Sequence, residues 1–393
     1  MASTKTRAVL DAASMTKNLL VGAYPGFVYG GPASRGVPVF CFHGVEPVLL
    51  EQQLRFLTEN GYRTLSTDEL HRIATGDRRP DLKSVMLTFD DGWGSLWSVG
   101  LPLFKKYNVR IVVLLAAGRI PWGDVGPTMD DRAQGRANST EVPGRDSSDH
   151  PLLTWEEVRS MHDTGLVDFQ SHTLTHARIF SSPRIVDFAS PSILGRYTLL
   201  QMPEWSPEDP GPPRLGRPMY ASAPRTGEAR RYLEDPDLRA ACEDYVAEQG
   251  GEQFFHRAGW RRELLGWVNH YRMSHTSMAR YETDEERAQA VWRELRDSKE
   301  LIEERLPGKS VTHVGYPWHC HSRLAVELSA KAGYLTNFVG KVRGRFIGIR
   351  PGEPCLVARV GGDFLFTLPG KGRVSLLRVL FNKLVRRSLS PES

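Results

Sequence analysis

Short apolar segments alternate with amphipathic segments along much of this chain, and this alternation constrains the fold more than any other feature. Continuous apolar runs of the kind found in strands buried on both faces are "VPVFCFHG" (37–44), "SVMLTF" (84–89), "VRIVVLLAA" (109–117) and "VTHVGYP" (311–317). The segments between them place apolar residues at helical spacing, as "LEQQLRFLTENGY" (50–62) does. Repeated strand-then-helix units predict an α/β fold with a parallel sheet, either a barrel or an open sheet.

Two helix starts can be read directly from side-chain chemistry. Ser66 precedes Glu69 by three residues, and Thr154 precedes Glu157 by three residues. In this capping-box pattern the hydroxyl and the carboxylate bind backbone N–H groups at the start of a helix. The sequence therefore predicts helices that begin at both positions.

The alternation breaks between residues 182 and 280, where prolines cluster up to Pro224 and a helical stretch follows. Proline rules out regular helix and interior strand in the first part of this segment. Trp260, Trp267 and Tyr271 lie at roughly helical spacing, which favours helix core over a sugar-stacking surface. We predict five parts: an N-terminal extension (1–36), the first part of the α/β domain (37–181), an insertion or lid (182–280), the second part of the domain (281–369), and a basic amphipathic tail (370–393).

Composition excludes several classes of protein. The net charge is only +5 over 393 residues, and the basic residues are scattered, which argues against nucleic-acid binding. The four cysteines are far apart and form no CxxC pair, as expected of reduced thiols. No apolar window approaches the roughly 20 residues of a membrane-spanning helix, and no segment has signal-peptide form. We therefore expect a cytoplasmic protein.

The C-terminal stretch "SLLRVLFNKLVRRSLS" (375–390) has apolar residues on one helical face and basic residues elsewhere. Such a helix can lie on an anionic membrane surface. It can equally dock on the domain through its apolar face, and the sequence leaves both interpretations open.

Polar residues follow three of the predicted strands, at the ends where sites assemble in α/β folds. These residues are Asp90 and Asp91, His172 and His176, and Tyr316, Pro317 and Trp318. Two imidazoles and one carboxylate are a common ligand set for a divalent metal. A bound cation would also offset the repulsion between two adjacent carboxylates. The simpler alternatives are an exposed Asp-Asp turn and a hydrogen-bonded surface pair of histidines.

The segments "TFDDG" (88–92) and "SHTLTH" (171–176) resemble the first two motifs of the polysaccharide deacetylase, or NodB-homology, family. The resemblance extends over residues 37–179 and 282–338. It implies a distorted (β/α) barrel with fewer than eight strands, interrupted here by the proline-rich and helical insertion. It also implies hydrolysis of an acetyl group on a sugar, with a divalent metal, usually zinc.

Carried over to this sequence, the resemblance implies a role for each polar residue. Asp90 would be the general base, and Asp91, His172 and His176 would hold the metal. The run Tyr316-Pro317-Trp318 would contact the substrate or its oxyanion.

The sequence departs from the family at two places. No leucine-x-histidine strand follows residue 338, but "FCFHGV" (40–45) resembles the circularly permuted form of the family and makes His43 the candidate acid. His319 and His321 are rivals for that role. The third motif has Gly315 where the family often has an arginine that orients the base, and no other residue is assigned to that arginine's place.

The predicted function is a metal-dependent hydrolase that removes an acetyl group from an N-acetylated sugar, with a nucleotide- or lipid-linked sugar as the preferred substrate. Two alternatives remain open. The same site could hydrolyse another amide, such as a formamide or a cyclic imide. The domain could also be a non-catalytic binding module, an interpretation that the missing arginine and the missing late histidine favour.

Overall fold

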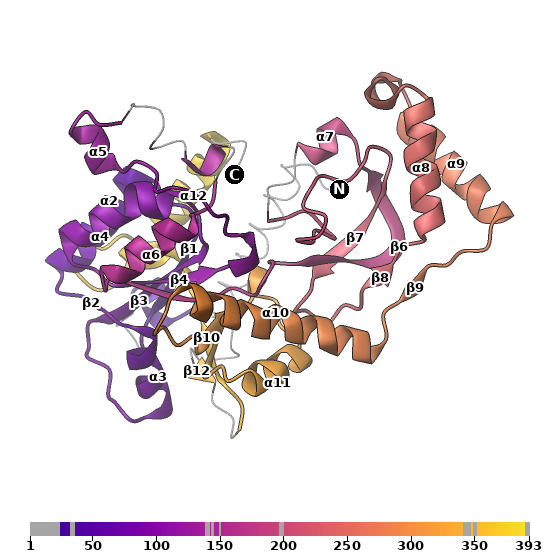
Figure 1. The fold of residues 1–393 in the computed structure, drawn as a ribbon. Helices are drawn as coiled ribbons and strands as arrows, with labels where there is room; N and C mark the ends of the chain where they lie inside the picture. The colour runs from indigo at the N-terminus through magenta and orange to yellow at the C-terminus, as the bar shows by residue number, and fades with distance from the viewer. Residues whose placement is uncertain are drawn as a thin grey trace. The chain divides into compact units, whose positions relative to one another are not determined.

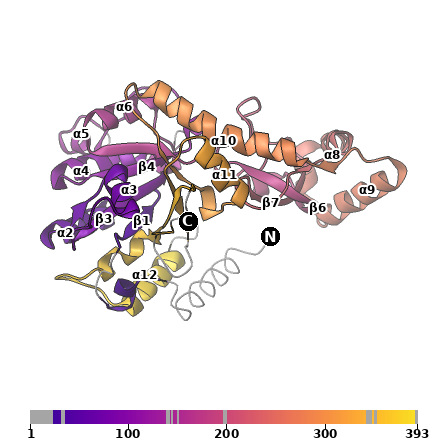
Figure 2. The ribbon, with the colours of Figure 1, turned by 90° about the horizontal axis from the view of Figure 1, so that it is seen from below.

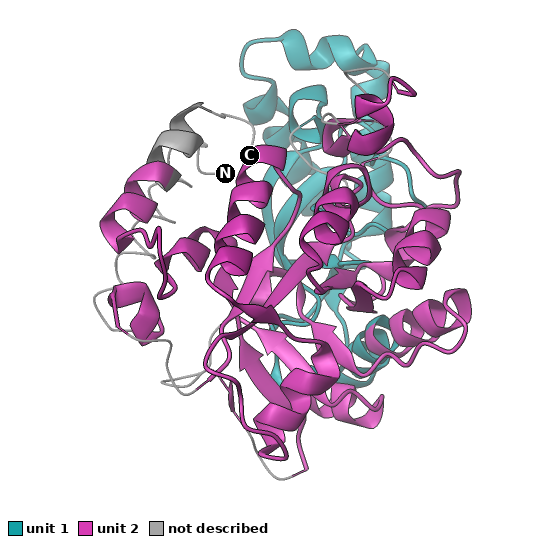
Figure 3. Ribbon diagram, turned by 90° about the vertical axis from the view of Figure 1, so that its left-hand side faces the viewer, with its two compact units in different colours: residues 1, 175–294, 321–325 teal, residues 2–174, 295–320, 326–393 magenta. Residues whose placement is uncertain are grey.

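The computed structural model describes residues 24–31, 36–137, 142, 145–148, 151–195, 200–340, 347–348 and 352–389, with side chains described as far as residue 382. Most of the predicted N-terminal extension lies outside these residues. The chain divides into two compact units, which Figure 3 shows in different colours. Unit 1 consists of residues 175–294 and 321–325, and unit 2 consists of residues 2–174, 295–320 and 326–393.

Unit 2 is built around a ten-stranded, mainly parallel sheet in the order β12-β13-β11-β10-β5-β4-β3-β1-β14, with β2 paired to β3 (Figure 1). Among the strands that the structure describes in this sheet, only the β12–β13 pair is antiparallel. The strands are β1 (Val39–Phe42), β2 (Arg63–Thr64), β3 (Ser84–Asp91), β4 (Ile111–Leu115), β5 (Val167–Ser171), β10 (His313–Gly315), β11 (Thr336–Val339), β12 (Ile347–Gly348), β13 (Cys355–Ala358) and β14 (Val360–Gly361). The predicted α/β class with a parallel sheet is confirmed.

The sheet closes on itself where β13 runs into β14. β13 pairs with β11, with Cys355 opposite Thr336, whereas β14 pairs with β1, with Val360 opposite Phe40. Only Arg359 separates the two strands. One stretch of chain therefore joins both ends of the sheet and makes it a barrel of the distorted (β/α) kind.

Helices α2, α4 and α6 lie in a row along one flank of unit 2 (Figures 1 and 2). The helices outside residues 175–294 are α2 (Pro47–Glu59), α3 (Thr67–Thr75), α4 (Leu101–Tyr107), α5 (Met129–Ala133), α6 (Trp155–Asp163), α11 (Arg323–Lys331) and α12 (Leu376–Leu389), and α10 (Asp284–Arg305) runs across that boundary. Both predicted capping boxes, Ser66 with Glu69 and Thr154 with Glu157, are present at the starts of α3 and α6.

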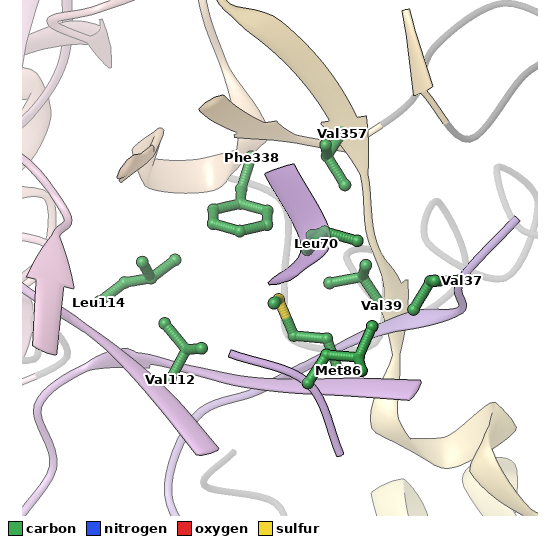
Figure 4. Close-up of a cluster of buried hydrophobic side chains, with 9 residues drawn as sticks. Val37, Val39, Leu70, Met86, Val112, Leu114, Phe338 and Val357 are labelled. Atoms are coloured by element: carbon green, nitrogen blue, oxygen red, sulfur yellow. The ribbon is translucent and has the colours of Figure 1, made fainter. Parts of the chain in front are cut away.

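The barrel interior is filled by side chains from strands that are far apart in sequence. Figure 4 shows this core, to which Val39, Met86, Val112, Leu114, Phe338 and Val357 contribute from five strands and Leu70 from α3. All of these side chains are buried. Burial on both sides explains why the strand segments are continuously apolar rather than alternating.

Unit 1 contains two small antiparallel sheets and a helical cluster. Its elements are β6 (Arg178–Phe188), β7 (Pro218–Pro224), β8 (Tyr232–Leu233), β9 (Arg280–Tyr281), α7 (Pro191–Leu194), α8 (Pro236–Glu248) and α9 (Trp260–Ser274). The proline-rich segment thus forms strand at both ends. A two-stranded sheet has no interior strand, and Pro183 lies where the β6–β7 register shifts, so the prolines remove no interior ladder bond.

The aromatic residues of α9 belong to the core of unit 1. Trp260 is buried in a cluster with Phe254, Leu264 and Val268, and Trp267 and Tyr271 pack against that cluster. The predicted core role for these residues is confirmed. Cys41, Cys242, Cys320 and Cys355 form no disulfide with one another. Among the described residues, none of the helices is both long enough and apolar enough to span a bilayer.

Candidate metal centre and active site

The polar residues singled out in the sequence lie at the carboxyl ends of parallel barrel strands. Asp90 and Asp91 end β3, His172 follows β5, and Gly315 ends β10. β3 pairs with β4, β4 with β5 and β5 with β10, so these strand ends meet at one edge of the sheet. The register explains why residues more than 200 positions apart can form one site.

Three of these residues form a group that could hold a metal ion. One ligand atom from each of Asp91, His172 and His176 lies within 4.8 Å of the others, and all three residues are buried. The indole N–H of Trp93 donates a 2.9 Å hydrogen bond to Oδ2 of Asp91. Oδ1 of Asp91 lies 3.5 Å from Nε2 of His172. Trp93 therefore fixes the carboxylate with one oxygen facing the imidazole.

Both imidazoles direct Nδ1 at a backbone carbonyl oxygen, so Nε2 is the nitrogen that can bind a metal. Nδ1 of His172 lies 2.8 Å from the Gly315 carbonyl oxygen, and Nδ1 of His176 lies 3.1 Å from the Leu200 carbonyl oxygen. A carbonyl oxygen can only accept, so each Nδ1 carries the proton and each Nε2 presents a lone pair. Backbone carbonyls orient metal-binding histidines in this way in many proteins. The donor set and its second layer of hydrogen bonds both fit a divalent cation.

The backbone around the site adopts conformations that side chains seldom occupy. The φ angle is positive at Asp91 (76°), Thr173 (66°), His176 (56°), Trp318 (50°) and His319 (56°). Such angles cost free energy outside glycine and tend to gather at functional sites. Within unit 1, Glu294 holds the turn before His176 by accepting hydrogen bonds from the backbone N–H and the hydroxyl of Thr175, at 3.0 and 2.5 Å.

Asp90 is paired with a buried arginine. Nη1 and Nη2 of Arg359 lie 2.5 and 2.9 Å from the two carboxylate oxygens of Asp90. Burial alone would raise the pKa of Asp90, but the charge of Arg359 and its hydrogen bonds outweigh it and hold that pKa well below its ordinary value. The Cys41 thiol, whose pKa burial raises, lies 3.4 Å from Oδ2 of Asp90 as a weak donor. Asp90 is therefore an anion with a fixed orientation.

Arg359 is the functional residue that sequence reasoning missed. The third motif left the place of the base-orienting arginine without a candidate, and the structure shows Arg359 in contact with Asp90 from a different strand end. It follows the apolar segment "CLVA" just as Asp90 follows "MLTF", so the rule that identified Asp90 would have found it. At Gly315 a Cβ atom would lie 2.4 Å from Cδ1 of Leu114, so a side chain there would require Leu114 to move.

The remaining predicted residues occupy different environments. His43 is exposed and lines a pocket of about 450 Å³ with Cys41, Gln53 and His319. His321 is not among the residues that line this pocket.

The residues of the "YPW" run differ from one another. Tyr316 is wholly buried, burial raises its pKa, and its hydroxyl accepts a 2.8 Å hydrogen bond from Asn337. Its side chain is thus part of the core. Trp318 is partly exposed within the turn Pro317–His319. The roles proposed for His43 and for the "YPW" run remain predictions.

Comparison with known proteins agrees with the motifs. Residues 77–192 match the family model described as polysaccharide deacetylase. Poly-beta-1,6-N-acetyl-D-glucosamine N-deacetylase of Escherichia coli K12 is 29% identical over 133 residues, which are 34% of this chain and 18% of the relative. YxkH of Bacillus subtilis, which carries the polysaccharide deacetylase name, is 25% identical over 129 residues, 33% of this chain and 36% of that protein.

The chain thus spans less than two thirds of the length of both relatives. Among solved structures, a de-N-acetylase from Aggregatibacter actinomycetemcomitans is 16% identical with a TM-score of 0.48, covering 82% of this chain and 94% of the other.

The matched stretch contains the strand that ends in Asp90 and Asp91 and the turn that carries His172 and His176. All four of these side chains therefore lie within the stretch that matches the family model. Residues 77–192 of this chain therefore match the polysaccharide deacetylase, or NodB-homology, family.

Proposed function

We propose that this protein is a metal-dependent deacetylase that hydrolyses the amide of an N-acetylated sugar. The observation that carries the proposal is the position of an ionised carboxylate, Asp90, beside the Asp91–His172–His176 set. The E. coli relative is named for an N-acetyl-D-glucosamine polymer, so we propose N-acetylglucosamine as the sugar unit.

Asp91, His172 and His176 would hold the cation, for which we propose zinc because two neutral imidazoles and a carboxylate suit it. A divalent ion bound there supplies Lewis acidity, which lowers the pKa of water and polarises a carbonyl group. Asp90 precedes Asp91 in the sequence, is unprotonated, and has Oδ2 3.8 Å from Nε2 of His172, and it is not part of the predicted cation set.

The proton movements in the proposed reaction follow from the side chains. Asp90 accepts a proton from the attacking water as its oxygen bonds to the acetyl carbon. Breaking the C–N bond then requires a proton on the departing sugar amine. We propose His43 as its donor, since His43 lines the pocket beside Cys41, whose thiol contacts the base. The products are acetate and a free amino sugar.

Acetate release from N-acetylglucosamine oligomers by the metal-loaded protein tests this proposal. Asp90→Asn should lower kcat by roughly 100- to 10,000-fold, as expected for loss of a general base. Asp209→Asn, at an exposed position, is the matched control and should behave like wild type. Equal rates for Asp90→Asn and wild type would reject Asp90 as the base.

A substrate panel separates the proposed reaction from hydrolysis of other amides. Free, nucleotide-linked and lipid-linked N-acetyl sugars should release acetate, whereas formamides and cyclic imides should not react. Formate release without acetate release would instead favour formamide hydrolysis. The non-catalytic interpretation has lost one of its two supports, because Arg359 supplies the charge that the third motif lacks.

We also propose that α12 contacts an anionic membrane surface. Leu377 and Phe381 lie one turn apart on this helix and are 79% and 65% exposed, and Arg378 between them is exposed as well. Apolar and basic groups together suit the lipid–water interface. The protein should sediment with anionic vesicles, and Leu377→Ser with Phe381→Ser should abolish this. Equal sedimentation with neutral vesicles would contradict the proposal. The predicted cytoplasmic location stays a prediction.

A further inference from the structure

His319 contacts the same guanidinium group of Arg359 that contacts Asp90. Nη2 of Arg359 donates to Asp90 and also lies 3.3 Å from Nδ1 of His319. An arginine side chain has five N–H donors and no acceptor, so Nδ1 of His319 must accept this hydrogen bond. The proton of the neutral ring is then on Nε2.

The backbone holds this ring in a defined place. Trp318 and His319 both have positive φ angles, and the N–H of His319 donates a 2.9 Å hydrogen bond to the Tyr316 carbonyl oxygen. A Cβ atom at Gly340 would lie 2.8 Å from Cβ of His319, so only glycine allows the neighbouring chain to approach this closely. Strained turns of this kind occur where a side chain must be presented in one orientation.

The environment also disfavours a second proton on the ring. His319 is exposed by its surface area, but the protein around its ring partly removes the ring from water, and this and the positive charge of Arg359 lower the pKa of His319 below its ordinary value. His319 is thus neutral near pH 7 and is poorly suited to the role of general acid. What it offers is a single N–H donor at Nε2.

His319 lines the 450 Å³ pocket that also contains His43 and Gln53. Asp91, His172 and His176 are not among the residues that line this pocket. A donor here is therefore suited to the sugar rather than to the acetyl carbonyl, toward which the predicted cation would act.

We propose that His319, locked by Arg359 as the Nε2–H tautomer, is a substrate-binding residue that donates a hydrogen bond to an oxygen of the sugar. This inference rests on the proposed function for its substrate class. The tautomer itself follows from the contact between Arg359 and His319 and does not depend on turnover.

Nuclear magnetic resonance of the full chain labelled with 15N-histidine tests both parts. The His319 signals, identified by their loss in His319→Gln, should show a protonated Nε2 and a bare Nδ1 that do not change between pH 8 and pH 5. Addition of the N-acetylglucosamine tetramer should shift the Nε2–H signal. A proton on Nδ1, titration within this pH range, or no shift with the tetramer would overturn the proposal, even for a protein that releases no acetate.

Kinetics of the metal-loaded enzyme give the matching readout. His319→Ala should raise KM for the tetramer by about 2- to 10-fold, the worth of one hydrogen bond, with kcat changed less than about 2-fold. His319→Gln, which keeps an N–H donor, should restore part of the loss, and His256→Ala at an exposed position should have no effect. An unchanged KM, or a fall in kcat alone, would contradict the assigned role.

Discussion

At the scale of single residues, Arg359 connects more of the site than any other side chain described above. Its guanidinium contacts both oxygens of Asp90, the Thr88 hydroxyl and the His319 ring. The side chain is fully buried, and so is Asp90 apart from a few per cent. Two buried charges in contact depend on each other, because either one alone would be an uncompensated charge in the interior.

Arg359→Met should therefore lower the free energy of unfolding by about 3–5 kcal/mol, the usual cost of breaking a buried ion pair. Urea denaturation measures this change. Arg359→Lys keeps the positive charge but cannot contact both oxygens of Asp90 in the same way, so it should lose less stability than Arg359→Met. Arg55→Met, at a surface position 55% exposed, is the control. If Arg359→Met were as stable as wild type, the ion pair would have no part in holding the site.

Some residues of the site could be predicted from the sequence, whereas the contacts that orient them could not. Asp90, Asp91, His172 and His176 are detectable because they follow apolar strands in a recognisable local pattern. The Arg359–Asp90 contact joins residues 269 positions apart, and no local pattern encodes it. The same is true of the Gly315 carbonyl oxygen, whose contact with His172 depends on the register of β10 against β5.

At the scale of secondary-structure elements, the end of β10 shows how a glycine can matter for a neighbouring ligand. The Gly315 carbonyl oxygen accepts from Nδ1 of His172, and a Cβ atom added at Gly315 would displace Cδ1 of Leu114. The absence of a side chain lets β10 lie against this part of the barrel. The strand end therefore controls the orientation of the imidazole.

Gly315→Ala should displace this strand end, lowering the free energy of unfolding by about 1–3 kcal/mol and metal affinity by about 10- to 100-fold. A metal titration with a competing chelator measures the affinity. Gly266→Ala in α9, where a Cβ meets nothing within 4 Å, is the matched control and should be neutral or slightly stabilising. Unchanged metal affinity in Gly315→Ala would contradict a role for β10 in orienting His172.

The short 3₁₀ helix η4 (Arg145–Ser147) supports two strand ends at once. Asp146 accepts from the backbone N–H and the hydroxyl of Ser95, at 2.8 and 2.6 Å, and the Ser95 hydroxyl accepts from the N–H of Val45. Burial raises the pKa of Asp146 above its ordinary value. This relay ties the turn that follows β3 to the turn that follows β1 and carries His43.

A raised pKa in the folded state means that protonated Asp146 is the form that folding favours. Its stabilising effect is complete below the unfolded pKa of about 3.9 and is lost as the pH rises through the folded value. Asp146→Asn cannot ionise, so its stability relative to wild type should increase from pH 4 to pH 7. Urea denaturation at both pH values tests this, and a constant or decreasing difference would contradict it.

The helices and strands with local sequence signals were easier to predict than those formed by long-range pairing. Apolar runs marked β1, β3, β4 and β10, and capping residues marked the starts of α3 and α6, because these signals are local. Strands β6 and β7, which lie at the two ends of the proline-rich segment, were not predicted. Their pairing joins segments about 40 residues apart, and proline chemistry alone does not reveal an isolated two-stranded sheet.

At the scale of the whole molecule, closure of the barrel is the feature that places the site. The β13–β14 stretch pairs with β11 on one side and β1 on the other, and Arg359 is at the point where the partner changes. Closure thus brings a residue from the last part of unit 2 against Asp90 from β3. A parallel sheet was predictable from the chain, whereas this change of partner was not, because it depends on long-range pairing.

The central claim is that Asp91, His172 and His176 together bind one divalent cation beside Asp90. Elemental analysis of protein incubated with zinc and then freed of loose metal tests it most directly, with His172→Ala as the disrupted site and His256→Ala as the control. About one metal ion per chain is expected for wild type and for His256→Ala, and almost none for His172→Ala. A wild-type protein that retains no metal, or a His172→Ala protein that retains as much as wild type, would contradict it.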